Sequence, residues 1–314
     1  MKTSLIIVDY KTMNDTIAYL EHCSRMIRDW RDVSVVIIDN DPALKDSSDF
    51  MTACKNAKRI EVKNGSMWEG TLFGRPVYYV RTLTNLGLAK GNNMGAAIAH
   101  KYFEPDYLLF SNNDIRFPEP VSLKTLQQVF AENPEAAAVG PAITTDKGEC
   151  QNPARFVRVK SALTRYYWNL LLPKSMRKHK REDWIEQAQD GFYDYISGSF
   201  VMIDMQKFVE IKGFDPSTVL FMEMPILSMR MEQLGYRMYY TGKIQLIHNQ
   251  RNTSDPIGGP IRHIRFDYQA KQQFYVKYGH LPMAYVLGTV LSFEIFFSLF
   301  WIKKTVLNLL GIRG

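Results

Sequence analysis

Cysteine is scarce in this chain of 314 residues, and its three copies lie far apart at Cys23, Cys54 and Cys150. Their number and spacing exclude a disulfide framework and a cysteine-based zinc site. Acidic residues are missing from Arg155–Arg181, a segment that holds nine lysine and arginine residues. The positive charge of this segment alone is larger than the net charge of the whole chain, which is +7. Positive charge concentrated in this way indicates a local partner, which is a membrane surface, a phosphate-bearing substrate or a nucleic acid.

Long hydrophobic runs are missing from the amino-terminal part. The four apolar residues Leu5–Val8 suit a buried strand and are too few for a signal peptide, so we expect no cleavable signal. Near the other end, the 20 residues Met283–Ile302 contain Glu294 as their one charge and precede Lys303 and Lys304. This run is long enough to span a bilayer, although Glu294 makes a span costly. We expect in-plane membrane attachment first, a homodimer interface second and a span third.

The first 115 residues alternate between strand and helix patterns, within a composition typical of globular proteins. The expected strands are Ser4–Asp9, Val33–Ile38, Arg75–Arg81 and Tyr107–Phe110, and the expected helices are Met13–Trp30 and Gly91–His100. Strands separated by helical crossovers predict an α/β fold with a mostly parallel sheet covered on both faces. Ligands bind beyond the carboxyl ends of such strands, where Asp9, Asp39 and Asn112-Asn113-Asp114 fall.

The second half is less regular. Its expected strands are Ala136–Val139, Tyr195–Asp204 and Arg237–Ile247, and its expected helices are Met222–Leu234 and Arg262–Tyr278. The basic segment has roughly helical apolar spacing and the aromatic run Tyr166-Tyr167-Trp168, which favours an interfacial role over a solvated positive face. Because no recognition motif accompanies the charge, we expect no nucleic-acid partner.

Two motifs in the first half are candidates for donor binding. Asp114, in Asn112-Asn113-Asp114, follows an apolar strand, where a carboxylate can hold a divalent cation; the alternative is a plain turn. The stretch Asn85–Gly95 places glycines near a helix start, where free N–H groups favour phosphate, and Lys90 adds a positive charge. Here the alternative is a structural loop and helix cap.

Three further motifs lie in the second half. Gly198 and Ser199 are small residues before a strand, which leave room for a ligand or allow close backbone packing. Glu223 is a candidate general base, or simply an acidic residue in a first helical turn. His248 follows an apolar strand and is either structural or a metal ligand or phosphate partner.

In order and spacing, these motifs resemble those of the family 2 glycosyltransferases with the GT-A fold. The resemblance covers residues 3–280 and is strongest to the bacterial rhamnosyltransferase-like branch, which builds surface polysaccharides. It implies a GT-A domain at residues 1–250, with a nucleotide-binding half at 1–115 and an acceptor half at 116–250. Residues 251–314 would form a helical region that associates with a membrane or dimerises.

The resemblance also implies an activity and a set of roles. A sugar, with rhamnose as the first expectation, would move with inversion from a dTDP- or UDP-linked donor, with Mg²⁺ or Mn²⁺. The acceptor would be a lipid-linked saccharide at the cytoplasmic face of the bacterial cell membrane. Asp114, Asn112 and His248 would hold the metal, and the residues implied in donor binding are Asp9, Tyr10, Asp39, Asn85, Lys90, Asn92, Asn93, Asn113, Gly198 and Ser199.

This sequence departs from the family pattern at two positions. The metal motif begins with Asn112 instead of aspartate, which removes one anionic ligand. The usual acidic pair is Glu223-Met224 here, and methionine cannot accept a proton, so the base is either Glu223, which we favour, or another carboxylate. The departure motivates an alternative, a catalytically silent homologue that acts as a binding or assembly subunit of a polysaccharide complex. A third option is a sugar-nucleotide-processing enzyme of the same fold.

Overall fold

The computed structural model describes residues 1–42, 48–62, 65–156, 168, 171, 184–218, 220–249, 259–278 and 282–309. These residues form two compact units. Unit 1 comprises the described residues up to Arg155 together with those of Trp184–Val219 and Glu223–Arg251, and unit 2 comprises the rest. The predicted amphipathic basic segment lies largely outside the described residues.

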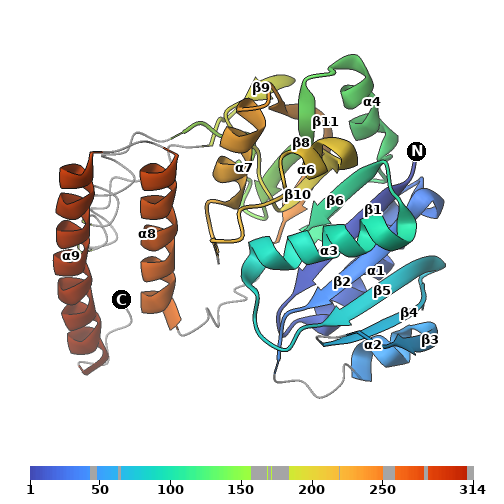
Figure 1. Ribbon diagram of the computed structural model, residues 1–314, viewed down its shortest axis with the longest axis horizontal. Helices are drawn as coiled ribbons and strands as arrows, with labels where there is room; N and C mark the ends of the chain where they lie inside the picture. The colour runs from blue at the N-terminus through green and yellow to red at the C-terminus, as the bar shows by residue number, and fades with distance from the viewer. Residues whose placement is uncertain are drawn as a thin grey trace. The chain divides into compact units, whose positions relative to one another are not determined.

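Unit 1 is built on one mixed sheet with helices on both faces (Figure 1). Within the described residues the strand order is β3-β4-β5-β2-β1-β6-β10-β8-β11-β7, and β9 also pairs with β11. The bounds are β1 Thr3–Asp9, β2 Val33–Asp39, β3 Lys55–Ile60, β4 Ser66–Leu72, β5 Arg75–Arg81, β6 Tyr107–Ser111, β7 Ile115–Arg116, β8 Ala136–Thr145, β9 Gly191–Tyr193, β10 Phe200–Asp204 and β11 Arg237–His248. The adjacent strands β5, β2, β1 and β6 run parallel, as the alternating pattern predicts.

The register of the parallel strands brings the polar strand ends to one edge of the sheet. Asp9 at the end of β1 lies directly opposite Asp39 at the end of β2. On the other side of β1, the parallel strand β6 ends at Ser111 and leads directly into Asn112. The sheet therefore gathers Asp9, Asp39 and the Asn112–Asp114 motif at its carboxyl edge, where ligands of open α/β sheets bind.

Helices cover the two faces of this sheet differently. The helices of unit 1 are α1 Met13–Met26, α2 Ser48–Ala53, α3 Gly87–Phe103, α4 Lys124–Glu132, α6 Met205–Glu210 and α7 Glu223–Glu232, with a short 3-10 turn at Trp30–Asp32. Figure 1 shows α3 crossing the sheet over β1 and β2. The opposite face carries Leu5 and Ile7, which share a buried core with residues of α1 and α4.

The glycines of α3 allow the helix to approach the sheet closely. A Cβ at Gly95 would lie 2.5 Å from Ile6 Cγ2, and one at Gly91 would lie 3.0 Å from the methyl groups of Val8. Distances this short leave no room for a larger side chain. These two glycines therefore pack the helix on the sheet, which is the structural alternative for the Asn85–Gly95 stretch.

Several elements differ from the predicted ones. The hairpin β3–β4 was not predicted, because β3 at the sheet edge has the sequence KNAKRI and no apolar alternation. Helix α4 was also missed, although Leu126, Val129 and Phe130 give it a buried face. The strand expected from Tyr195 begins at Phe200, because Ser197 and Ser199 use their hydroxyl groups in a local turn.

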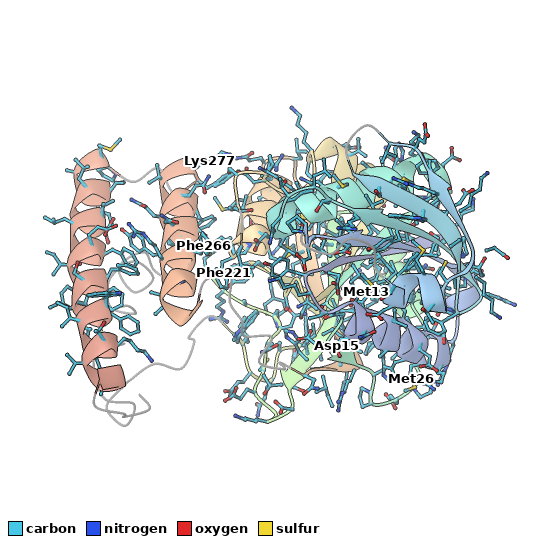
Figure 2. The ribbon with its side chains drawn as sticks, turned by 90° about the horizontal axis from the view of Figure 1, so that it is seen from below. Met13, Asp15, Met26, Phe221, Phe266 and Lys277 are labelled. Atoms are coloured by element: carbon cyan, nitrogen blue, oxygen red, sulfur yellow. The ribbon has the colours of Figure 1, made fainter. Side chains whose placement is uncertain are left out.

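Unit 2 contains the helices α8 Gly259–Lys277 and α9 Met283–Leu309. Both Figure 1 and Figure 2 show α8 and α9 side by side, with Lys277 labelled on α8 in Figure 2. Within α9, Met283–Leu307 is long and apolar enough to cross a membrane, with a mean hydropathy of 1.8. A core helix passes the same test of length and composition, so the environment of α9 has to be argued from its exposed side chains.

Candidate active site

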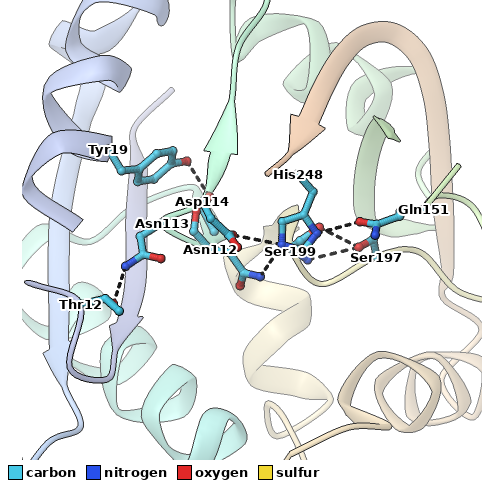
Figure 3. Close-up of polar contacts among 10 residues, drawn as sticks. Thr12, Tyr19, Asn112, Asn113, Asp114, Gln151, Ser197, Ser199 and His248 are labelled. Atoms are coloured by element: carbon cyan, nitrogen blue, oxygen red, sulfur yellow. Dashed lines mark hydrogen bonds and ion pairs between the residues drawn. The ribbon is translucent and has the colours of Figure 1, made fainter. Parts of the chain in front are cut away.

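Asp114 and His248 form a close pair at the carboxyl edge of the sheet (Figure 3). The antiparallel pairing of β7 with β11 sets His248 opposite Ile115, and Asn249 N–H donates to the Asp114 carbonyl at 2.9 Å. His248 Nε2 consequently lies 3.0 Å from Asp114 Oδ1, and the two side chains are 12% and 14% exposed. Two residues from distant parts of the chain thus meet in one nearly buried polar centre.

Gln151 fixes the orientation of the His248 ring. Its Oε1 lies 2.7 Å from His248 Nδ1, and an amide oxygen only accepts hydrogen bonds, so Nδ1 carries a proton. Gln151 itself is 8% exposed, and its backbone N–H donates to the Ile143 carbonyl at 2.8 Å. The sequence analysis missed Gln151, because this residue belongs to no motif and meets His248 only in the folded chain.

The atoms that face each other in this pair suit a cation. Asp114 Oδ1 is buried and accepts no hydrogen bond from the described residues. In the neutral ring with its proton on Nδ1, Nε2 presents a lone pair towards that oxygen, and two electron-rich atoms at 3.0 Å repel unless a proton or metal ion lies between them; in the protonated ring, Nε2–H pairs with the Asp114 carboxylate. The Asn112 amide nitrogen lies 3.4 Å from Nε2. The described residues contain no cluster of three or more His, Cys, Asp or Glu side chains that could hold a metal ion, and Asp114 and His248 form a pair of such side chains.

Asp9 and Asn113 organise the loop between β1 and α1. The Asp9 carboxylate is 1% exposed and accepts hydrogen bonds from the hydroxyl groups of Thr12 and Thr16 at 2.8 Å and 2.6 Å. Burial raises the pKa of Asp9. Asn113 donates from Nδ2 to the same two hydroxyl oxygens, each at 2.8 Å, which leaves its own amide oxygen outside this network. The neighbouring Tyr10 is half-buried.

Asp39 and Asn85 are likewise held by partners within the protein. Asp39 is fully buried and accepts from Tyr79 Oη at 2.5 Å and from the Asp41 N–H at 3.1 Å. Asn85 Oδ1 accepts from Asn40 Nδ2 at 3.0 Å and from the Gly87 N–H at 2.9 Å. Asn40, which the sequence analysis did not single out, links the end of β2 to the start of α3. Its position directly after Asp39 at a strand end was the available signal.

The polar residues of α3 point in different directions. Asn93 Nδ2 donates to the Phe214 carbonyl and its Oδ1 accepts from the Phe214 N–H, both at 2.9 Å. The Asn93 amide therefore clamps the Gly213-Phe214-Asp215 loop. Asn92 is 8% exposed, whereas Lys90 is exposed to solvent. Of these predicted donor-binding residues, Lys90 has the most accessible side chain.

The Ser197–Ser199 segment joins the metal motif to the start of α7. Asn112 N–H donates to the Ser199 carbonyl at 2.9 Å, and the hydroxyl groups of Ser197 and Ser199 lie 2.8 Å apart. A Cβ at Gly198 would lie 3.0 Å from Met224 Cγ. Gly198 thus allows the first turn of α7 to lie against the segment that holds Asn112, which brings the two predicted motifs together.

Glu223 is the first residue of α7 and the buried acid of this region. It is 8% exposed, and its Oε1 has no hydrogen-bond partner among the described residues. Burial raises the pKa of Glu223 to about 7. The two preceding residues, Phe221 and Met222, have φ angles of 72° and 65°, a conformation that costs energy for side chains larger than glycine. A strained turn therefore precedes the Glu223 carboxyl group, whose pKa is raised, at the start of α7.

Comparisons with known proteins agree with this fold. No protein-family model matches the sequence. Rhamnosyltransferase WbbL of Escherichia coli is 25% identical over 165 residues, 52% of this chain and 60% of WbbL. The N-acetylglucosaminyl-diphospho-decaprenol L-rhamnosyltransferase of Mycobacterium tuberculosis is 23% identical over 195 residues, 60% of each chain. The chain thus spans 60% of the length of these curated relatives.

A solved structure extends the likeness over most of the chain. The crystal structure of GalNAc-T7 with UDP, GalNAc and Mn²⁺ aligns with 90% of this chain and 52% of GalNAc-T7, with a TM-score of 0.53 and 15% identity. The fold is that of the GT-A glycosyltransferases. Within that class, the chain resembles the rhamnosyltransferases of family 2, in agreement with the sequence motifs.

Proposed function

We propose that this protein is a metal-dependent, inverting glycosyltransferase. It transfers a sugar, rhamnose in the first instance, from a UDP- or dTDP-linked donor to a lipid-linked saccharide. The observation that carries the proposal is the Asp114–His248 pair, joined through Asn112, Ser199 and Gly198 to the start of α7, where Glu223 lies. The similarity to two rhamnosyltransferases supports the choice of sugar.

A divalent ion fits the Asp114–His248 pair. The buried Asp114 oxygen and the His248 Nε2 lone pair form a donor set of the kind that binds Mn²⁺, and the carboxylate also suits Mg²⁺. Gln151 supplies the outer hydrogen bond that metal-bound histidines usually make. When bound, the ion supplies charge neutralisation for the diphosphate leaving group. Lys90, exposed on the first turns of α3, adds positive charge on the donor side.

Glu223 is the proposed general base. As the acceptor hydroxyl oxygen forms its bond to the sugar carbon, the Glu223 carboxylate takes the hydroxyl proton, and the bond from that carbon to the donor diphosphate breaks. A base works best when its pKa lies near the working pH, and the Glu223 pKa of about 7 meets that condition. Methionine follows where the family has a second acid, so Glu223 has no neighbouring carboxylate in sequence to share this role.

The acceptor side of the proposal includes the membrane. The name of the mycobacterial relative describes transfer to a decaprenol-linked saccharide. Polyprenol-linked acceptors reside in a bilayer, and the apolar helix α9 and the basic segment give this chain features that suit a bilayer surface. We therefore propose that the protein acts at the cytoplasmic face of the bacterial cell membrane.

The role of Glu223 is tested by paired substitutions on one helix. Turnover of dTDP-rhamnose with an N-acetylglucosaminyl-diphospho-polyprenol acceptor is measured for Glu223→Gln and for Glu232→Gln, which lies exposed on the same helix. We expect Glu223→Gln to lower kcat by about 10²–10⁴-fold, because the amide cannot accept the proton, while donor binding persists. Glu232→Gln should match the wild type. Unchanged turnover in Glu223→Gln removes this residue as the base.

One observation favours a second candidate function. Asp9, Asp39, Asn85 and Asn93 all have polar groups bonded within the protein, and Met224 replaces an acid. A catalytically silent homologue that binds a nucleotide or saccharide within a polysaccharide-synthesis complex would show these features. Nucleotide binding without any turnover across UDP- and dTDP-sugars would favour this function over the enzyme.

A further inference from the structure

Helix α9 has two opposite faces. At about 100° per residue, Val286, Phe293, Phe296 and Phe300 fall on one side, and each is at most 8% exposed. The opposite side carries six large apolar residues that are each 44–65% exposed, and we call this set the apolar face of α9: Leu287, Leu291, Ile295, Leu299, Ile302 and Val306. A row of exposed apolar side chains this long is uncommon on a soluble protein and marks an interaction surface.

The buried side of α9 packs against α8. The rings of Tyr268 and Phe293 stack with centroids 3.7 Å apart and planes 6° apart. Arg265 of α8 pairs with Glu294 at 3.1 Å, and its guanidinium lies 5.0 Å from the centroid of the Phe297 ring. The one charge within Met283–Ile302 is therefore neutralised from the neighbouring helix, and the apolar face itself carries no charged residue.

The partner helix α8 cannot enter hydrocarbon. Its sequence contains Arg262, Arg265, Asp267, Lys271 and Lys277, and Lys271 pairs with Asp267 at 2.8 Å. If α9 crossed a bilayer, the packing described above would draw α8 in beside it. Each charged residue at the bilayer centre costs about 2.5–3.5 kcal/mol on insertion scales. The α8–α9 packing is thus incompatible with a membrane span of α9.

We propose that α8 and α9 lie in the plane of a phospholipid surface, with the apolar face of α9 inserted among the acyl chains. The adjacent Trp301, which is 54% exposed, suits the interfacial layer, and Lys304 suits anionic headgroups, whereas Lys303 Nζ donates to the Leu171 carbonyl at 2.9 Å. The nine-cation basic segment, whose Trp168 donates to Ser292 of α9 at 3.0 Å, adds to that attraction. The inference deepens the proposed function by specifying how the enzyme meets its lipid-linked acceptor, and in that respect rests on it.

The experiment measures sedimentation of the full-length protein with preformed vesicles made of equal parts phosphatidylglycerol and phosphatidylethanolamine. The test variant is Leu291→Gln/Ile295→Gln, on the apolar face. The matched control is Val209→Gln/Leu234→Gln, two apolar residues of unit 1 that are similarly exposed. We expect the test variant to lower vesicle partitioning at least tenfold, because two apolar side chains no longer enter the bilayer, and the control to match the wild type. Alkaline carbonate should release the bound wild-type protein.

Other results would overturn the proposal. Equal partitioning of the test variant and the wild type would show that the apolar face does not enter lipid. Carbonate-resistant binding would indicate a span. A wild-type protein that stays off vesicles and forms a dimer in analytical ultracentrifugation, with the dimer lost in the test variant, would assign the face to a second copy of this chain.

The test is independent of catalysis. Metal-dependent nucleotide binding by the test variant, measured by calorimetry, shows that unit 1 is intact whatever the vesicle result. If vesicle binding follows the expected pattern but no nucleotide binds to the wild type, the proposed function fails while the membrane surface stands. The converse result rejects the membrane surface alone.

Discussion

Asp114 and Glu223 each have a buried carboxylate oxygen that lacks a hydrogen-bond donor among the described residues. Most buried polar atoms in proteins are satisfied, so two such oxygens at neighbouring motifs indicate groups kept for a ligand or a proton. Sequence motifs located both residues, because Asp114 follows an apolar strand and Glu223 opens a helix. The motifs could not locate Gln151 or Asn40, since each acts through a hydrogen bond to a distant part of the chain.

The raised pKa of Glu223 has a consequence for stability. Between the ordinary pKa of 4.5 and about 7, the native state holds a proton that the unfolded chain has lost, so the free energy of unfolding falls as pH rises. Glu223→Gln removes this loss, on the order of 1–3 kcal/mol. We expect the variant to have the higher Tm at about pH 8 and a similar Tm at about pH 4. A Tm difference that does not change with pH would show that Glu223 is not held protonated by burial.

The Gln151 side chain should tune metal affinity. Gln151→Leu removes the acceptor for His248 Nδ1, and loss of such an outer hydrogen bond typically weakens metal binding about 10–100-fold. Gln127→Leu is a matched control, because Gln127 is 2% exposed but bonds Thr3, and it should leave Mn²⁺ affinity unchanged while lowering stability. Calorimetric titration with Mn²⁺ alone separates the two. Equal weakening in both variants would mean that only general packing was disturbed.

At the scale of elements, the parallel strands are the well-predicted part and the sheet edges are not. Buried parallel strands such as Val33–Asp39 are continuous apolar runs that a sequence reveals directly. The edge strand β3 is exposed and polar, and the turn at Ser197–Ser199 depends on side-chain hydrogen bonds, so neither has a hydrophobic period to recognise. A sequence also does not distinguish a glycine that lies against a phosphate from one that packs on a strand. Gly91 and Gly95 of α3 therefore resemble a phosphate-binding loop, although they lie against Val8 and Ile6.

The packing of α3 gives a stability prediction. Gly95→Ala places a methyl group 2.5 Å from Ile6 Cγ2, so we expect the free energy of unfolding to fall by about 1–3 kcal/mol. Gly288→Ala in α9 has no atom within 4 Å of the new methyl group and should be neutral or stabilising, since alanine favours helix over glycine. Thermal unfolding of both variants checks this. A neutral Gly95→Ala would place α3 farther from the sheet than described.

At the scale of the whole molecule, the resemblance of the motifs predicted the GT-A fold correctly, and the solved structure confirms it over 90% of the chain. The polar side chains of the donor half were harder to assign, because the sequence cannot tell a carboxylate that meets a ligand from one that meets Thr16 or Tyr79. We propose that unit 1 carries out the chemistry and that the α8–α9 pair binds the lipid surface.

The most direct test of the central claim is calorimetric titration of UDP and dTDP into the full-length protein, with and without Mn²⁺. The account predicts that one nucleotide binds in the presence of Mn²⁺ and that binding is lost without the metal or in Asp114→Asn, because Asp114 and His248 would hold the ion that neutralises the diphosphate. A folded protein that binds neither nucleotide, or binds equally well without Mn²⁺ and with Asp114→Asn, would contradict it.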